Sequence, residues 1–278
     1  MRSVLLRLRE VQDSLSTTES YIAEYIRSNA HESINLTVRE MADKTFTSPS
    51  SVVRLCRTVG FSGYKEFKQA LLIELASINQ ETQNKNLKVE KEDTISTIID
   101  KVTYQNIKSL EETLLLLDNS IVEKSIDLIL NSKRILLFGI GSSQFVARDF
   151  YLKLLRLNKN SIINEDVHSQ LLQAKNSAAD DVAIMYSYSG ETKEVLEYLE
   201  YCQKNKTPVI AITRYSQSNL SLNATYRLYT SASEPLFRNG AMSSRLSQLN
   251  INDILYTGMI NKEYDRSMNL LTITHIKK

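Results

Sequence analysis

The segment SYSGET, residues 187–192, places three hydroxyl side chains around one glycine, directly after an apolar run that is typical of a strand. Ser187, Ser189 and Thr192 can each donate a hydrogen bond to an oxyanion, and Gly190 lets the backbone close around it. A helix is predicted to follow, and its unpaired amide groups and positive dipole end favour an anion such as phosphate. The alternative is a simple helix start in which Ser189 acts as the N-cap.

A pair of glycines occupies another predicted strand-to-helix turn, in the stretch ILLFGIGSSQFVA. Gly139 and Gly141 would let backbone amides approach a ligand there. A dinucleotide-binding loop requires a third glycine near the position of Gln144, even though Glu165 and Asp166 follow at a suitable distance. The chain contains no Gly-Lys-Ser/Thr tripeptide, which excludes a Walker phosphate loop. We therefore expect no nucleotide cofactor.

Two arginines in the N-terminal part could contact DNA, because arginine pairs with guanine and with phosphate. Ser48 is a suitable N-cap for a helix that begins at Pro49. At about 100° per residue, one side of this helix is apolar and carries Val52, Leu55, Cys56 and Val59. The opposite side carries the residues that could read DNA, namely Ser50, Val53, Arg54, Arg57 and Thr58. The alternative is a helical interaction module whose arginines are merely solvated.

The distribution of charge supports a local contact with nucleic acid. The formal net charge of the chain is only +2, so its overall field is weak and a DNA contact requires a local basic surface. Between Arg39 and Lys68 there are six basic residues and three acidic ones. The basic excess therefore surrounds the predicted DNA-reading helix.

The elements that must position these groups fall into two domains. Residues 1–76 are typical of short helices, and residues 77–93 have the polar composition of a linker. A long amphipathic helix follows, after which short β-rich runs alternate with helices that include 191–205 and 241–263. The prediction is an all-α domain followed by an α/β domain at 94–278, whose doubly wound parallel sheet is flanked by helices.

Composition excludes several classes of protein. Hydrophobic residues make up 42% and charged residues 24% of the 278 residues, as in ordinary globular proteins. Cys56 and Cys202 are far apart and imply neither a disulfide framework nor a metal site. The N-terminus is not a signal peptide, and no apolar run is long enough to cross a bilayer. We expect a cytoplasmic protein without a membrane partner.

The stretch TVREMADKTFTSPSSVVRLCRTVGFSGYKEFKQAL, residues 37–71, resembles the helix-turn-helix of the RpiR family of bacterial transcription regulators. The matching pattern runs from Ser48 and the arginines through Gly60-Phe61 and Gly63-Tyr64 to Glu66-Phe67-Lys68. The resemblance implies binding to operator DNA. We assign this contact to Ser48, Ser50, Ser51, Arg54, Arg57 and Lys65.

The sequence GIGSS, followed downstream by SYSGET, is similar to the sugar isomerase (SIS) domain, a fold that binds phosphosugars. The similarity places Ser142 and Ser143 in the first ligand loop. It assigns the phosphate-holding loop to Ser187, Ser189, Gly190 and Thr192. Glu234 is a further candidate ligand contact, because SIS enzymes use a glutamate in a comparable region.

Together the two resemblances imply a transcription regulator of carbohydrate metabolism that senses a sugar phosphate and binds its operator as a homodimer or homotetramer. The ligand would be a signal, and we assign no catalytic residue. One alternative is a phosphosugar isomerase with an accessory DNA-binding head, in which Glu165, His168 or Glu234 would be the general base. Another is a nonenzymatic module that binds protein through its helical head.

Overall fold

The computed structural model describes residues 3–77, 89–231 and 242–275. The chain forms two compact units, Met1–Gln105 and Asn106–Lys278. The division falls within helix α7 (Ile95–Leu116), so this helix contributes residues to both units. The predicted linker at 77–93 lies mostly outside the described residues, and the domain boundaries given by the sequence stay a prediction.

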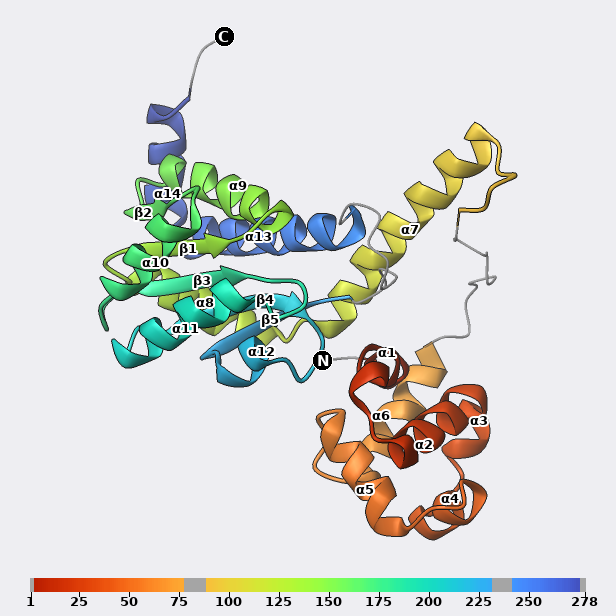
Figure 1. Ribbon diagram of the computed structural model, residues 1–278. Helices are drawn as coiled ribbons and strands as arrows, with labels where there is room; N and C mark the ends of the chain where they lie inside the picture. The colour runs from red at the N-terminus through yellow and green to blue at the C-terminus, as the bar shows by residue number, and fades with distance from the viewer. Residues whose placement is uncertain (1–2, 78–88, 232–241, 276–278) are drawn as a thin grey trace. The chain divides into compact units, whose positions relative to one another are not determined.

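The N-terminal unit is helical throughout its described part, as predicted (Figure 1). Its buried side chains include Leu8, Ile22, Met41, Leu55 and Leu71. Its elements are α1 (Val4–Glu10), the 3₁₀ helix η1 (Gln12–Ser14), α2 (Thr17–Ser28), α3 (Ala30–Ser33), α4 (Val38–Lys44), α5 (Pro49–Thr58) and α6 (Tyr64–Ser77).

Side-chain caps mark the start of four of these helices, and at α1 the Ser3 side chain accepts from the Leu6 amide. Ser16 and Glu19 form a capping box at the start of α2, and Thr37 and Glu40 form another at the start of α4. The Ser48 side chain accepts a hydrogen bond from a backbone amide in the first turn of α5, which has proline at its first position. The predicted helix start at Ser48-Pro49 is therefore confirmed.

The C-terminal unit contains a five-stranded parallel sheet with strand order β2-β1-β3-β4-β5. The strands are β1 (Ile135–Gly139), β2 (Ser161–Ile163), β3 (Val182–Tyr186), β4 (Val209–Arg214) and β5 (Tyr226–Thr230). The helices beyond α7 are α8 (Asn119–Asn131), α9 (Ser142–Arg156), α10 (Val167–Lys175), α11 (Lys193–Lys204), α12 (Asn219–Asn223), α13 (Met242–Lys262) and α14 (Tyr264–Ile273).

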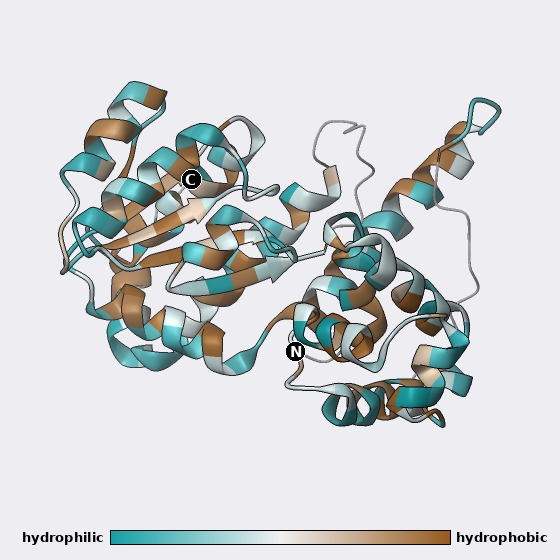
Figure 2. Cartoon of the chain, turned by 60° about the horizontal axis from the view of Figure 1, so that its bottom comes forward, coloured by the Kyte–Doolittle hydropathy of each residue, from teal (hydrophilic) through white to brown (hydrophobic). Residues whose placement is uncertain are grey.

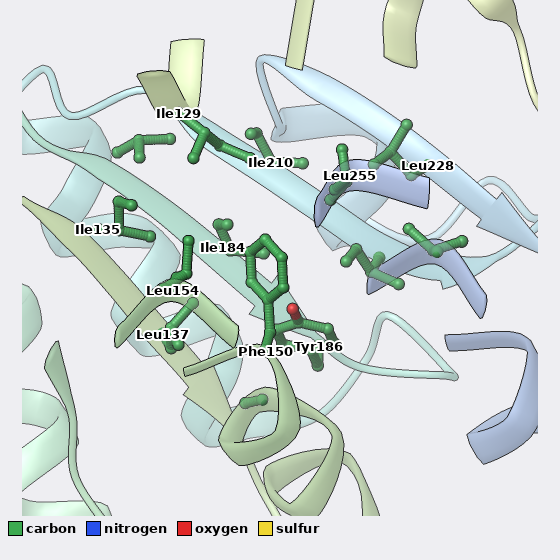
Figure 3. Packing of buried hydrophobic residues seen from close by; sticks show 14 of the residues in the cluster. Ile129, Ile135, Leu137, Phe150, Leu154, Ile184, Tyr186, Ile210, Leu228 and Leu255 are labelled. Carbon is green, nitrogen blue, oxygen red and sulfur yellow. The ribbon is translucent and has the colours of Figure 1, made fainter. Parts of the chain in front are cut away.

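Helices cover both faces of the sheet, so the predicted doubly wound α/β architecture is confirmed. On one face, side chains such as Phe150 of α9 and Leu255 of α13 pack against the sheet (Figure 3). On the other face, α10, α11 and α12 contribute Ala174, Tyr198 and Leu220. Because both faces are covered, every residue of β1 and β3 is buried, and the strands are largely apolar (Figure 2).

One helix start differs from the prediction, and one helix was not predicted. Helix α11 begins at Lys193, two residues later than predicted, because Thr192 keeps an extended backbone and forms its hydroxyl hydrogen bond with Ser187. Residues 187–192 therefore form a longer loop than the sequence indicated. The predicted helix at 241–263 is confirmed within the described residues as α13, but the sequence did not predict α14, which follows Glu263 with its non-helical ψ of 50°.

Candidate DNA-binding and ligand-binding sites

Burial of one side of α5 fixes which side chains face solvent. Val52, Leu55 and Cys56 are at most 1% exposed, as the sequence predicted. Burial raises the pKa of the Cys56 thiol to about 12, so this side chain acts as a packing group and not as a nucleophile. The opposite side of α5 is therefore available for a partner.

The exposed side of α5 borders a shallow groove of about 510 Å³, lined by Val38, Pro49, Ser50, Val53, Arg54 and Arg57. Three of the six predicted DNA contacts, Ser50, Arg54 and Arg57, lie together there and are exposed. Ser48 and Ser51 lie at the start of the same helix and hydrogen-bond to each other at 2.9 Å. Lys65 is exposed in the first turn of α6. Their role in DNA binding stays a prediction.

Arg54 is held by a neighbouring helix. Its Nε lies 3.4 Å from Oε1 of Glu19 on α2, and the Arg54 side chain remains 62% exposed. Burial raises the pKa of Glu19, but hydrogen bonds from Ser16 and the charge of Arg54 outweigh it and hold the pKa below its ordinary value. The carboxylate thus stays ionised at neutral pH and orients the Arg54 guanidinium without covering it.

The turn between α4 and α5 contains a residue that sequence reasoning missed. Phe46 is 97% exposed and has φ of +51°, a conformation that bulky side chains rarely adopt. The turn is closed by a hydrogen bond of 2.8 Å from the Thr47 amide to the Ala42 carbonyl. Neither the composition of this segment nor its spacing indicated that an aromatic ring just before α5 would be exposed.

The candidate ligand site lies where the direction of the sheet connections changes. Strands β1 and β3 are neighbours, and Gly139 pairs in register with Tyr186. Helix α9 leaves β1 toward one face of the sheet, whereas α11 leaves β3 toward the other. In such sheets a crevice forms at the carboxyl ends of the two strands and commonly binds ligands. Both predicted serine loops, 140–143 and 187–192, follow these two strands.

Hydroxyl groups converge in the loop after β3, which we call the cradle, residues 187–192. Ser187 Oγ and Thr192 Oγ1 share a hydrogen bond of 2.9 Å, and the Gly190 amide donates to Ser187 Oγ at 3.2 Å. Ser189 Oγ accepts from the Glu191 amide at 3.2 Å, upstream of the helix. The alternative that Ser189 is a simple N-cap is wrong, because α11 begins at Lys193.

The cradle is held in place by β4 and α12. The carbonyl of Tyr188 accepts from the Arg214 amide at 3.0 Å, and the carbonyl of Gly190 accepts from the Leu220 amide at 3.1 Å. Gly190 has φ of +69°, and a Cβ there would collide with the side chain of Ser218. The cradle is therefore preformed, and glycine is required at its centre.

Both helices that begin at the crevice lack a side-chain cap. Gly141 occupies the N-cap position of α9 with φ of +60°, and Thr192 occupies that of α11, yet neither provides a capping hydrogen bond. By contrast, α10 and α12 are capped by Asp166 and Ser218. At the starts of α9 and α11 no N-cap side chain competes with an anion for the first-turn amides.

Sequence reasoning also missed the residue that fixes the first loop. Gln170 of α10 is 1% exposed, and its side chain both accepts from the amide and donates to the carbonyl of Gly139, each at 3.1 Å. Of the predicted contacts in this loop, Ser143 is buried and Ser142 is half-buried in the first turn of α9. Nothing in the spacing of Gln170 pointed to this role, because the pairing depends on the packing of α10.

Two of the three candidate bases, Glu165 and His168, lie within the described residues. Glu165 is exposed and forms an ion pair with Arg148 at 2.7 Å, and His168 is exposed on α10. Glu234 lies outside the described residues. Within residues 3–77, 89–231 and 242–275, no three acidic, histidine or cysteine side chains group as metal ligands would. In the same ranges, none of the helices combines the length and hydropathy needed to span a bilayer.

Two family models match the chain. A helix-turn-helix domain of the rpiR family matches residues 2–78, and the SIS domain matches residues 128–258. The matched regions contain α5 and the two serine loops. Fold and loops therefore define a helix-turn-helix regulator that carries a SIS domain.

Relatives match over nearly the full chain. An uncharacterized HTH-type transcriptional regulator of Caldanaerobacter subterraneus is 34% identical over 274 residues, 99% of this chain and 96% of the relative. The corresponding regulator YbbH of Bacillus subtilis is 30% identical over 268 residues, 96% of this chain and 94% of the relative. The chain therefore belongs to the RpiR family of transcriptional regulators, which confirms the resemblance seen in its sequence.

Solved structures show the same architecture. The NanR protein of Vibrio vulnificus complexed with ManNAc-6P has a TM-score of 0.60 and 28% identity, covering 98% of this chain and 96% of that chain. The sugar isomerase domain of an RpiR transcription factor from Sphaerobacter thermophilus has a TM-score of 0.58 and 18% identity, covering 63% of this chain and 97% of that chain. At that identity, the second similarity concerns the fold alone.

Proposed function

We propose that this regulator binds operator DNA through α5 and responds to a sugar phosphate bound at the crevice of its SIS domain. The observation that carries the proposal is the preformed cradle, whose hydroxyl groups adjoin the uncapped start of α11. A phosphoryl group satisfies open amides and hydroxyl donors together. The similar NanR protein was solved with a sugar phosphate, which supports the same class of ligand here.

The DNA contact is proposed from the chemistry of the exposed side of α5. Arg54 and Arg57 supply charge and bidentate donors, and Ser50 lies beside them along the groove. The proposed contacts also include Ser48, Ser51 and Lys65. Arginines on one helix side can contact both phosphate and base edges when that helix enters the major groove.

We propose that ligand binding regulates and does not lead to catalysis. An isomerase requires a general base within hydrogen-bonding reach of the sugar. Glu165 is paired with Arg148, and His168 is exposed to solvent. The regulator names of the full-length relatives also support a sensing role.

A homodimer or homotetramer is proposed because symmetric operators are read by symmetric proteins. Helix α7 exposes large apolar side chains, among them Ile95, Ile99 and Leu114, which are between 61% and 73% exposed. Such residues are suited to an interface between copies of the chain. A ligand that prefers one arrangement of the dimer would change the spacing of the DNA-binding heads and so change operator affinity.

The proposal is tested by measuring DNA binding with and without sugar phosphates. Fluorescence anisotropy on the DNA flanking the gene would compare the wild type with Arg57→Ala and Ser189→Ala, each with and without a panel of hexose and N-acetylhexosamine 6-phosphates. Arg57→Ala should weaken DNA binding by about 1–3 kcal/mol. Ser189→Ala should retain DNA affinity and lose the response to the panel.

Matched controls separate these effects from changes in folding. Arg148→Ala removes an exposed arginine from α9, and Ser120→Ala removes an exposed hydroxyl from α8, so neither should alter the corresponding readout. In thermal unfolding, a sugar phosphate at 100 times its Kd should stabilise the wild type by about 2.7 kcal/mol. DNA binding without salt dependence, or a full ligand response in Ser189→Ala, would contradict the proposal.

A further inference from the structure

Three buried polar atoms of the C-terminal unit have no hydrogen-bond partner within the described residues. They are Nε of Arg214, Oγ1 of Thr230 and Nε2 of Gln248. Thr230 is 0% exposed and Gln248 is 2% exposed. Native proteins pair nearly all such groups, so unpaired ones need a physical explanation such as a ligand or an ordered water.

Arg214 and Thr230 lie side by side. They are the last residues of β4 and β5, and they are partners in the register of the parallel pair. Side chains alternate along a strand, so Arg214 shares a face with Ile212, and Thr230 shares a face with Leu228. Ile212 and Leu228 both belong to the core that α9 and α13 cover (Figure 3 labels Leu228). Both polar residues therefore lie at the carboxyl edge of the sheet, on its α13 side.

Gln248 lies on α13, one turn before Asn252. The Asn252 side chain accepts from the hydroxyl of Tyr186 at 2.7 Å and donates to the carbonyl of Val146 at 2.9 Å. Tyr186 ends β3 and is followed directly by Ser187 of the cradle. The Asn252 side chain thus connects α13 to the end of β3 and to the first turns of α9.

Helices α9 and α13 run in the same direction along this face of the sheet (Figure 1). Asn252 of α13 donates to Val146 of α9, and farther along the chain Glu263, just after α13, pairs with Lys159, which follows α9. Since Gln248 precedes Asn252 by one turn, and the start of α9 precedes Val146 by one turn, Gln248 lies level with the uncapped end of α9. The unpaired amide is therefore beside the same crevice as the cradle.

We propose that Gln248, together with Thr230 and Arg214, forms a subsite for the sugar portion of the effector whose phosphate lies in the cradle. This inference rests on the proposed function. The amide, hydroxyl and guanidinium groups can all donate hydrogen bonds. The subsite therefore recognises acceptor oxygens of the sugar, and it discriminates among sugar phosphates that share the same phosphate contact.

The variant Gln248→Met tests this role, because it removes the amide and keeps a side chain of similar length. Calorimetric titration would use inorganic phosphate and the tightest-binding member of the sugar phosphate panel. Affinity for the sugar phosphate should fall about tenfold, and affinity for inorganic phosphate should not change. Thermal stability without ligand should be unchanged or higher, because the amide nitrogen has no partner in the free chain. Gln203→Met, an exposed change on α11, is the matched control.

The possible results distinguish a failure of the subsite from a failure of the proposed function. If the wild type binds no member of the panel, sensing of a sugar phosphate is refuted and the subsite is refuted with it. If the wild type binds and Gln248→Met binds equally well, only the subsite is refuted. If the affinity of Gln248→Met for inorganic phosphate falls as much as its affinity for the sugar phosphate, or if the variant unfolds at a lower temperature, Gln248 has a structural role and the subsite is refuted. Should Gln248→Met not fold, Thr230→Val provides the same comparison of sugar phosphate with inorganic phosphate.

Discussion

Replacing Gly190 by alanine should distort the cradle at its centre. The glycine has φ of +69°, where an L side chain is strained, and an added Cβ would collide with the side chain of Ser218. Thr213 Oγ1 would also lie at 3.1 Å, closer than most real Cβ contacts. Both neighbours are at most 4% exposed and have little room to move. The substitution therefore combines backbone strain with overpacking.

The magnitude follows from these two contributions. Strain at a disfavoured φ costs about 1–3 kcal/mol, and overpacking of a buried site costs about 1–3 kcal/mol. We expect Gly190→Ala to lower the free energy of unfolding by about 2–6 kcal/mol. Gly141→Ala is the matched control, because Gly141 also has a positive φ, yet a Cβ there would meet nothing within 4 Å. In Gly141→Ala the free energy of unfolding should therefore fall only by the strain contribution, about 1–3 kcal/mol.

Urea unfolding of both variants, followed by circular dichroism, would measure the difference. Gly190→Ala should be less stable than Gly141→Ala by about 1–3 kcal/mol, which is the overpacking contribution. It should also lose inorganic phosphate binding, because the hydroxyl groups can no longer converge. Equal stability of the two variants, with phosphate binding intact in Gly190→Ala, would refute the view that the cradle is preformed and tightly packed.

Two further predictions concern folding. Phe46→Gly should stabilise the chain by about 0.5–1 kcal/mol in urea unfolding, because it removes strain at a positive φ and loses almost no buried area, whereas Phe46→Ala should not. Asp181→Asn should lower the free energy of unfolding by about 3 kcal/mol at pH 7, because the Asp181 carboxylate, which is 1% exposed, binds the Arg134 guanidinium at 2.6 and 2.9 Å. Burial raises the pKa of Asp181, but hydrogen bonds from Arg134 and the Ala178 amide lower it below the ordinary 3.8. The carboxylate therefore stabilises the fold above that pH. The difference in the free energy of unfolding between wild type and Asp181→Asn should shrink as the pH falls through the lower native pKa of Asp181. A difference in this free energy that does not depend on pH would contradict this reasoning.

Local patterns were sufficient to predict most elements of the fold. The fully apolar strands, such as Val182–Tyr186, follow from coverage of both faces of the sheet, and Ser48-Pro49 marks the start of α5. The two serine loops were also predictable, because glycine and hydroxyl residues follow directly after strands. These features depend on residues that are close together in the chain.

The remainder of the site depends on how distant segments pack. Arg214 and Thr230 are separated in sequence and become register partners only through the pairing of β4 with β5, and Gln248 of α13 joins them only in the proposed subsite. The pairing of Gln170 with Gly139 likewise requires α10 to lie against β1. The late start of α11 results from a hydroxyl hydrogen bond within the cradle, which competes with capping of the helix. No periodicity in the sequence carries this information.

The distribution of helix caps is itself an argument for function. An N-cap side chain stabilises a helix by about 1 kcal/mol, and the chain uses one at α1, α2, α4, α5, α8, α10 and α12. At α9 the cap position holds Gly141, and at α11 the hydroxyl of Thr192 turns to Ser187 instead. Stability alone would favour a capping side chain at both ends. Helices α3 and α14 also lack a side-chain cap, but α9 and α11 both begin at the crevice, where the proposed ligand's anionic group would take the place of both caps.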